Sequence, residues 1–311
     1  MAGKIALLML ILLSVLLCAI LIAGCTSVST SDRPVSPYPM TVTDDSGRVM
    51  AINAAPQRIV SLSPANTEIL YALGLGDHIV GVDVNSNYPP EARSRPLMGG
   101  MTNVSVAKVV ASRPDLVLVS QFTPADTVND LSAAGLTVFC SHPDNASDTG
   151  RTILALGTIL GVPDRARQLY NNMSADIAPI MEKTSRLSEG RKPTVLMIIT
   201  LDPRMYVADP GNYMDSLITI GGGHNVATGA VMTQEEVLEA DPDIIIVPLT
   251  DWTRATYDGL RNSREPWMRG LKAVKAGRVC AVDYDAVGRP GPRMGEGAML
   301  IAKVLHPEMF T

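Results

Sequence analysis

The stretch VVASRPDLVLVS (residues 109–120) combines a helix end, a Pro-Asp turn and an apolar strand, and VLEADPDIIIVP (237–248) repeats this layout. The proline stops the helix because its ring clashes with the preceding turn. The strands LVLV and IIIV do not alternate apolar with polar residues. Such continuous apolar runs are typical of parallel strands that helices cover on both faces. The two stretches therefore predict two similar α/β halves.

Other short β-branched runs extend this pattern on both sides. With the strands at 116–120 and 244–248 of the two stretches above, the first half has candidate strands at 59–62, 79–82, 116–120 and 137–140, and the second half has them at 194–199, 244–248 and 279–283. Helical stretches separate these strands, as they do in proteins whose sheets lie under layers of helices. The sequence therefore predicts an α/β fold made of two lobes with parallel sheets.

Between the two halves lies the stretch PDRARQLYNNMSADIAPIMEKTSRLSEG (163–190). Pro163 suits the first position of a helix, and Gly190 suits the residue that ends one. Apolar residues form one stripe along this stretch, at 166, 169, 173, 177, 180 and 187. We expect a single long helix that joins a lobe at 41–162 to a lobe at 191–311. The alternative is an ordinary surface helix within one large domain.

The N-terminal segment is typical of an exported protein. A short start with one lysine precedes residues 5–23, which carry no charge. The segment ends in Leu-Ile-Ala-Gly-Cys, which resembles a lipobox, so residues 1–25 are expected to form a lipoprotein signal with Cys25 as the lipidated residue. A bilayer span needs roughly 20 apolar residues, so an uncleaved anchor is the alternative. Both hypotheses place the folded part outside the cytoplasm and tethered to the membrane, on its outer face.

Residues 26–40 are rich in Ser, Thr and Pro, which predicts a flexible tether. Beyond it, Cys140 and Cys280 lie in short apolar runs far apart in the sequence, and we expect two buried free thiols rather than a disulfide. The four histidines, spread from His78 to His306, have no metal-ligand spacing. We therefore expect no metal site.

Composition excludes several classes of function. The 311 residues carry 26 Lys and Arg against 31 Asp and Glu, a formal charge of −5 without a long basic run, which argues against a nucleic-acid partner. The sequence lacks the G-x-S-x-G motif of an α/β hydrolase. We therefore expect a binding protein without catalytic residues or a resident cofactor.

Several short motifs carry a family resemblance. They are SPANTE (63–68), YPP (88–90), GGHN (222–225), TQEEVL (233–238) and the pattern Asp285…Arg289…Pro292-Arg293. In order and spacing, over roughly residues 41–308, the chain resembles the substrate-binding proteins of ABC importers for cobalamin and iron-siderophore complexes. The resemblance implies the helical-backbone periplasmic-binding-protein fold, with two lobes on one long helix. It also implies a monomer that delivers its cargo to an ABC permease with ATPase subunits.

The resemblance further implies that one exposed glutamate in each lobe docks onto arginine pockets of the permease. The matching positions are Glu68 and Glu235, with Glu236 as an adjacent alternative. In the helix that starts at Ser63-Pro64, Glu68 falls about 120° from the centre of the apolar face, so we expect its side chain to face solvent.

We expect the cargo to bind between the lobes, at the ends of the strands, where α/β sheets bind their ligands. Aromatic side chains offer flat faces to a large ring system, and arginines offer forked donors to anionic groups. The candidates in the first lobe are Ser63, Asn66, Asn85, Tyr88, Gln121 and Phe122. Those in the second lobe are Met205, Tyr206, Asp251, Trp252, Asp285, Arg289 and Arg293.

The expected cargo is cobalamin or a ferric chelate, but the sequence departs from the cobalamin-binding pattern at two places. Met101 stands where those proteins have a tryptophan, and Ser120-Gln121-Phe122 stands where they have an aromatic directly after the strand. Haem, or an oxyanion such as molybdate or tungstate, therefore remains an alternative cargo. A sensor that binds the same ligands without transporting them is an alternative function.

Overall fold

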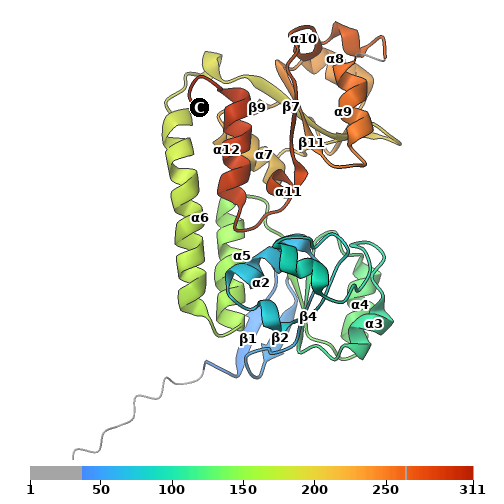
Figure 1. The fold of residues 1–311 in the computed structure, drawn as a ribbon, viewed down its shortest axis with the longest axis vertical. Helices are drawn as coiled ribbons and strands as arrows, with labels where there is room; N and C mark the ends of the chain where they lie inside the picture. Colours follow the sequence, from blue (N-terminus) through green and yellow to red (C-terminus); the bar gives the residue numbers. More distant parts are fainter. Residues whose placement is uncertain (1–36, 263–264, 311) are drawn as a thin grey trace, which may run out of the picture. The chain divides into compact units, whose positions relative to one another are not determined.

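The computed structural model describes residues 37–262 and 265–310, and the chain from Tyr38 onward forms one compact unit (Figure 1). The expected signal and Cys25 lie outside the described residues. The unit opens with an antiparallel hairpin of β1 (Met40–Thr43) and β2 (Val49–Ile52). The Tyr38 hydroxyl donates to the Ile159 carbonyl at 2.7 Å. The folded part therefore starts before residue 41, and the expected tether at 26–40 is too long at its C-terminal end. Among the described helices, none has the length and apolar character of a membrane span.

The first lobe contains a sheet of four parallel strands in the order β4-β3-β5-β6. Its strands are β3 (Ile59–Ser61), β4 (Ile79–Val82), β5 (Leu116–Ser120) and β6 (Val138–Ser141), and its helices are α2 (Pro64–Ala72), α3 (Val106–Ala111) and α4 (Ala125–Ala133). All five residues of β5 are buried. Leu116 and Leu118 belong to one core cluster, whereas Val117 and Val119 belong to another on the opposite face. The prediction that both faces of this strand are covered is confirmed.

The second lobe contains a mixed sheet in the order β10-β8-β7-β11-β12, in which β9 also pairs with β7. Its strands are β7 (Thr194–Thr200), β8 (Met205–Val207), β9 (His224–Asn225), β10 (Val231–Met232), β11 (Ile244–Leu249) and β12 (Val279–Asp283). Its helices are α7 (Tyr213–Ile220), α8 (Gln234–Ala240), α9 (Arg254–Arg261), α10 (Lys272–Lys275), α11 (Tyr284–Val287) and α12 (Met294–Leu305). The strands β7, β11 and β12 are parallel as predicted, and β8 returns antiparallel to β7.

The long helix α6 (Pro163–Thr184) lies against α5 (Ala146–Ile159) of the first lobe and against α12 of the second (Figure 1). Its apolar stripe, including Met173, Ile177 and Ile180, is buried. The helix ends at Thr184, six residues before the expected end, where the Thr184 hydroxyl donates to the Ile220 carbonyl at 2.9 Å. The predicted fold of two α/β lobes with one long helix between them is confirmed.

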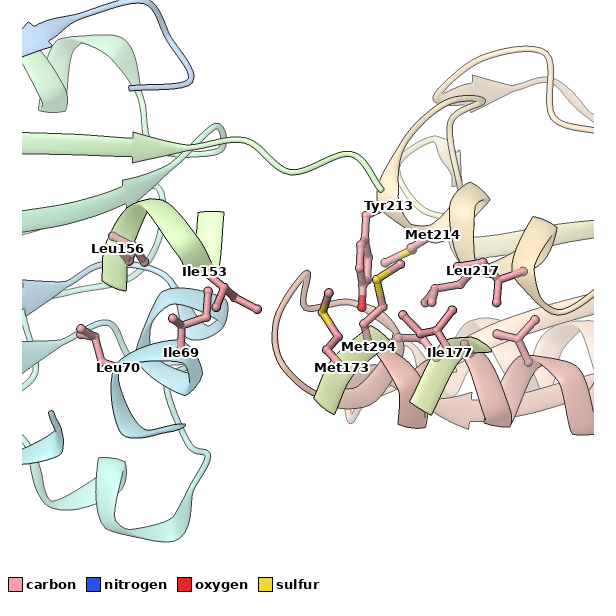
Figure 2. Close-up of a cluster of buried hydrophobic side chains, with 14 of the residues drawn as sticks. Ile69, Leu70, Ile153, Leu156, Met173, Ile177, Tyr213, Met214, Leu217 and Met294 are labelled. Atoms are coloured by element: carbon pink, nitrogen blue, oxygen red, sulfur yellow. The ribbon is translucent and has the colours of Figure 1, made fainter. Parts of the chain in front are cut away.

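One cluster of apolar side chains runs from the first lobe into the second (Figure 2). Ile69 of α2 and Ile153 of α5 belong to it in the first lobe, and Leu217 of α7 and Met294 of α12 belong to it in the second. Because this core includes the inner face of α6, the helix is packed along its length against both lobes.

Candidate ligand site between the lobes

A pocket of about 470 Å³ lies at the carboxyl ends of the parallel strands of both lobes. Crevices at this edge of a parallel sheet are the usual ligand sites of α/β proteins, and the volume falls in the range of about 300–1,000 Å³ seen for small-molecule sites. The first lobe lines it with Ser63, Pro64, Ala65, Val84, Asn85, Asn87, Met101, Ser120, Gln121, Phe122, Ser141 and Pro143. The second lobe lines it with Thr250, Asp251, Trp252, Tyr284, Asp285, Gly288, Arg289 and Pro290.

Eight of the predicted site residues line this pocket. They are Ser63, Asn85, Gln121, Phe122, Asp251, Trp252, Asp285 and Arg289. All of them lie in segments that follow a strand, which is the signal on which the prediction was based.

Two predicted residues are wrong because their side chains are buried in the protein. Asn66 donates its side-chain amide to the Val119 carbonyl at 3.2 Å and accepts a bond from Ser141, so it ties α2 to the sheet. Met205 packs in the core of the second lobe. Neither side chain lines the pocket.

Three other candidates also lie outside the pocket lining. Tyr206 is exposed on β8. Arg293 is engaged with Glu68, and its guanidinium lies 4.0 Å from the centre of the Tyr88 ring. That distance allows a cation–π contact, so Tyr88 and Arg293 contact each other in this structure.

Sequence reasoning missed several lining residues. Thr250 and Tyr284 follow β11 and β12 directly, and Val84 lies two residues after β4, so their place at strand ends could have identified them. Ser141 is the last residue of β6, one position beyond the predicted strand at 137–140. Met101 was noted only as a departure from the cobalamin-binding pattern, yet it lines the pocket.

Two large aromatic side chains stand exposed in this pocket, one from each lobe. Phe122 of the first lobe is 60% exposed and Trp252 of the second is 58% exposed. Tyr284 supports the Trp252 ring edge-on, with ring centroids 6.1 Å apart and planes at 68°. Single exposed apolar residues are common on protein surfaces. Two that line the same pocket from opposite lobes form an apolar surface suited to a flat ligand.

A buried ion-pair cluster joins the lobes beside the pocket. Glu68 of α2 accepts from Arg289 Nη1 at 2.9 Å, from Arg293 Nε at 3.0 Å and from Arg293 Nη2 at 3.1 Å. Arg289 also donates to the Asn85 carbonyl at 3.2 Å and to Asp285 at 2.6 Å. Burial alone would lower the pKa of Arg293, but the hydrogen bonds and charge of Glu68 outweigh it and raise that pKa. Glu68 therefore links two arginines more than 200 positions away in the sequence.

The expectation that Glu68 faces solvent is wrong. Glu68 is only 3% exposed, and both of its carboxylate oxygens accept hydrogen bonds from arginines of this same chain. The side chain points away from the first-lobe core, as its position on α2 implied, but the second lobe covers that face. Glu68 is therefore a contact between the lobes in this structure and is not available to a permease.

Next to this cluster, Asp83 is completely buried after β4. Its carboxylate accepts from the Ser86 hydroxyl and from the Asn85 amide. Burial raises the pKa of Asp83, and the two hydrogen bonds and the charge of Arg289 only partly oppose it. Folding therefore favours the protonated form of this side chain.

We expect Asp83→Asn to change how stability depends on pH. Between the unfolded pKa of about 3.9 and the raised folded pKa, the folded wild type binds more protons than the unfolded chain, so Asp83 lowers stability as pH rises. The free energy of unfolding of the variant minus that of the wild type should therefore increase across this window. Urea unfolding at several pH values measures it. A difference that is constant with pH would contradict the prediction.

Comparisons with known proteins agree with this architecture. The model of the periplasmic binding protein family matches residues 59–286. An uncharacterized ABC transporter substrate-binding lipoprotein of Bacillus subtilis, YvrC, is 34% identical, and the match covers 96% of each chain. A cobalamin-binding protein of Halobacterium salinarum is 28% identical over 89% of this chain and 76% of its own. Among solved structures, the periplasmic heme-binding protein RhuT of Roseiflexus, in apo form, is similar with a TM-score of 0.70 and 26% identity, covering 80% of this chain and 99% of its own.

Proposed function

This chain belongs to the periplasmic binding protein family, as a substrate-binding component of an ABC transporter and not an enzyme, and we propose that its pocket captures a metal chelate, either a corrinoid or a ferric siderophore. The observation that carries the proposal is the pair of exposed aromatic rings, Phe122 and Trp252, in one pocket between the lobes. Burying such rings against a flat macrocycle stabilises a complex through the apolar area removed from water. The cobalamin-binding relative from Halobacterium supports a corrinoid.

The polar groups of the pocket suit a ligand that carries hydrogen-bonding groups around the edge of its ring system. Asn85, Gln121 and Thr250 offer amide and hydroxyl groups around the aromatic pair. Arg289 lines the pocket, but three of its hydrogen bonds already go to Glu68, Asp285 and the Asn85 carbonyl. These contacts fix the orientation of Arg289 in the pocket wall.

Haem is a second candidate cargo. The similar solved structure RhuT is a heme-binding protein, and haem offers the same kind of flat metal macrocycle to Phe122 and Trp252. The described residues contain no group of three or more His, Cys, Asp and Glu side chains that could hold a metal ion. The rings of the pocket support recognition of the chelate through its flat macrocycle.

The test is binding of defined probes to the purified protein. Cobalamin, a ferric siderophore, haem and molybdate are each added, and complexes are read by native mass spectrometry and visible absorbance. We expect one chelate to remain bound with a stoichiometry of one. Binding of molybdate with no binding of any chelate would contradict a chelate cargo and favour an oxyanion receptor.

We further propose that Glu235 forms one of the contacts with the permease. It lies exposed at the start of α8, and its carboxylate has no partner among the described residues. The neighbouring Glu236 is instead engaged in a capping box, where it accepts from the Thr233 amide at 2.7 Å. That bond lowers the pKa of Glu236 and holds it against the helix. The structure therefore favours Glu235 over Glu236 as the residue that can reach a partner.

Glu235→Arg should reduce uptake of the cargo at least tenfold while leaving its affinity for the protein unchanged. Reversing a charge at a polar contact replaces an attraction by a repulsion, which costs several kcal/mol at a matched interface. Uptake by cells and affinity by calorimetry are the two measurements. Glu239→Arg, an exposed position on the same helix, is the control for the change in net charge. Equal uptake by the two variants would exclude Glu235 as a docking residue.

We also propose that the protein is lipid-anchored through Cys25 on the outer face of the membrane. The relative YvrC is described as a substrate-binding lipoprotein, and the sequence before Cys25 resembles a lipobox. A diacylated cysteine carries two chains, which anchor a protein stably. A mass increase confined to the peptide that contains Cys25 is the expected finding.

A further inference from the structure

The first turn of α2 lies in the wall of the pocket. Ser63, Pro64 and Ala65 all line it. The first N–H groups of a helix have no acceptor within the helix. Pro64 has no N–H, so in α2 these groups belong to Ala65 and Asn66. Ser63 at the N-cap makes no side-chain cap bond. These N–H groups and the helix dipole give this part of the pocket a partial positive charge. Helix starts of this kind favour anions.

A second feature of the same pocket independently calls for a hydrogen-bond partner. Ser120, the last residue of β5, is only 7% exposed, and its Oγ has no hydrogen-bond partner among the described residues. A buried hydroxyl without a partner costs free energy. Such a group in a native structure calls for an explanation. Since Ser120 lines the pocket, a ligand atom in the pocket can supply the missing partner.

We propose that the start of α2 and the Ser120 hydroxyl together form a subsite for an oxyanion group on the cargo, a phosphodiester or a carboxylate. The inference rests on the proposed function, because it assigns one end of a chelate to this wall of the pocket. The Ser120 hydroxyl and the Ser63 hydroxyl are the side-chain donors, and the first N–H groups of α2 are the backbone donors.

The acidic side chains of the pocket do not oppose this assignment. Asp285 is neutralised by Arg289 at 2.6 Å and also accepts from Asn87 at 3.0 Å. Asp251 comes from the second lobe and is exposed, whereas both elements of the subsite belong to the first lobe. Because the cargo would contact the oxyanion subsite at one end and the aromatic rings on its faces, these contacts together would fix its orientation as well as its position.

Matched pairs of probes test the subsite. Cobalamin carries a phosphodiester that cobinamide lacks, and haem carries two carboxylates that its dimethyl ester lacks. Ser120→Ala should weaken binding of the member that carries the oxyanion group by about tenfold or more, since it removes a hydrogen bond to a charged group. It should leave affinity for the member without that group unchanged. Its melting temperature should equal or exceed that of the wild type, because the lost hydroxyl had no partner.

The pair that shows the effect identifies whether a phosphodiester or a carboxylate occupies the subsite. Equal loss for both members, no loss for either, or a lower melting temperature would overturn the subsite while the proposed cargo class stands. A wild type that binds no chelate from either pair and no ferric siderophore would refute the proposed function. If that protein still binds free molybdate and Ser120→Ala weakens this binding, the subsite stands for a free oxyanion. If molybdate does not bind, or its binding is unaffected, the subsite is overturned as well.

A second pair of variants tests the helix start. Asp and Asn are both good N-cap residues, so Ser63→Asp and Ser63→Asn should both fold, and they differ only in charge. We expect Ser63→Asp to bind the probe that carries the oxyanion group at least tenfold more weakly than Ser63→Asn. Equal affinities would show that no anion lies at the start of α2.

Discussion

Replacing Glu68 by alanine should lower the free energy of unfolding by about 3–5 kcal/mol, the usual cost of removing one partner from a buried ion pair. The change leaves Arg289 and Arg293 facing each other without the carboxylate that separates their charges. Arg289 retains Asp285 and the Asn85 carbonyl. Arg293 retains Glu296 at 3.4 Å, the Asp285 carbonyl and the Tyr88 ring, but no buried carboxylate. Urea unfolding, followed by a probe in each lobe, measures the loss.

Glu296→Ala is the matched control for this experiment. Glu296 also pairs with Arg293, but 52% of its side chain is exposed. Exposed ion pairs contribute about 0–1 kcal/mol, so the control should stay close to the wild type. If Glu68→Ala costs no more than Glu296→Ala, the buried cluster does not hold the lobes together.

The position of Glu68 shows what periodicity in a sequence can and cannot predict. The apolar spacing of α2 correctly placed Ile69 and Leu70 in the core and Glu68 away from it. Periodicity identifies the face that packs on its own lobe, but it does not reveal a second surface contributed by residues more than 200 positions away. The contact of Glu68 with Arg289 and Arg293 depends on how two lobes meet, and no local pattern encodes that.

The strands also divide into those that the sequence predicts and those that it does not. The apolar runs at 79–82, 116–120 and 279–283 form β4, β5 and β12 with the predicted bounds. The strands β8, β9 and β10 have only two or three residues each, which is too short for a recognisable period. Tertiary pairing rather than local sequence makes these segments strands.

The missed strand β8 also explains two errors in the site. Met205 and Tyr206 were expected near the carboxyl end of the strand that begins at Thr194. In the structure the chain turns after Thr200 and returns as β8, antiparallel to β7. Tyr206 pairs with Thr200, the last residue of β7, so both residues stay near the carboxyl end of that strand, but β8 lies on the side of β7 away from β11. There Met205 packs in the core of the second lobe and Tyr206 is exposed outside the pocket. Candidates in the loops that follow β5 and β11, such as Gln121 and Trp252, do line the pocket.

Trp252→Ala and Phe122→Ala should each weaken binding of the chelate by about 30-fold or more. Large aromatic residues at the centre of a binding surface typically contribute at least about 2 kcal/mol each. The two rings come from opposite lobes, so they contact different parts of the ligand, and the double variant should lose nearly the product of the two effects. Calorimetry or titration followed by visible absorbance gives the affinities.

Tyr206→Ala provides the control for the loss of an exposed aromatic ring. Tyr206 is 40% exposed, but it lies on β8 outside the pocket, so its removal should leave affinity unchanged. All three side chains are exposed, and their truncation should change stability little. A difference in affinity between the variants therefore reports ligand contact rather than unfolding. If Tyr206→Ala weakens binding as much as Trp252→Ala, the chelate does not bind between the two aromatic rings, and the ligand site must extend to the β8 edge of the second lobe.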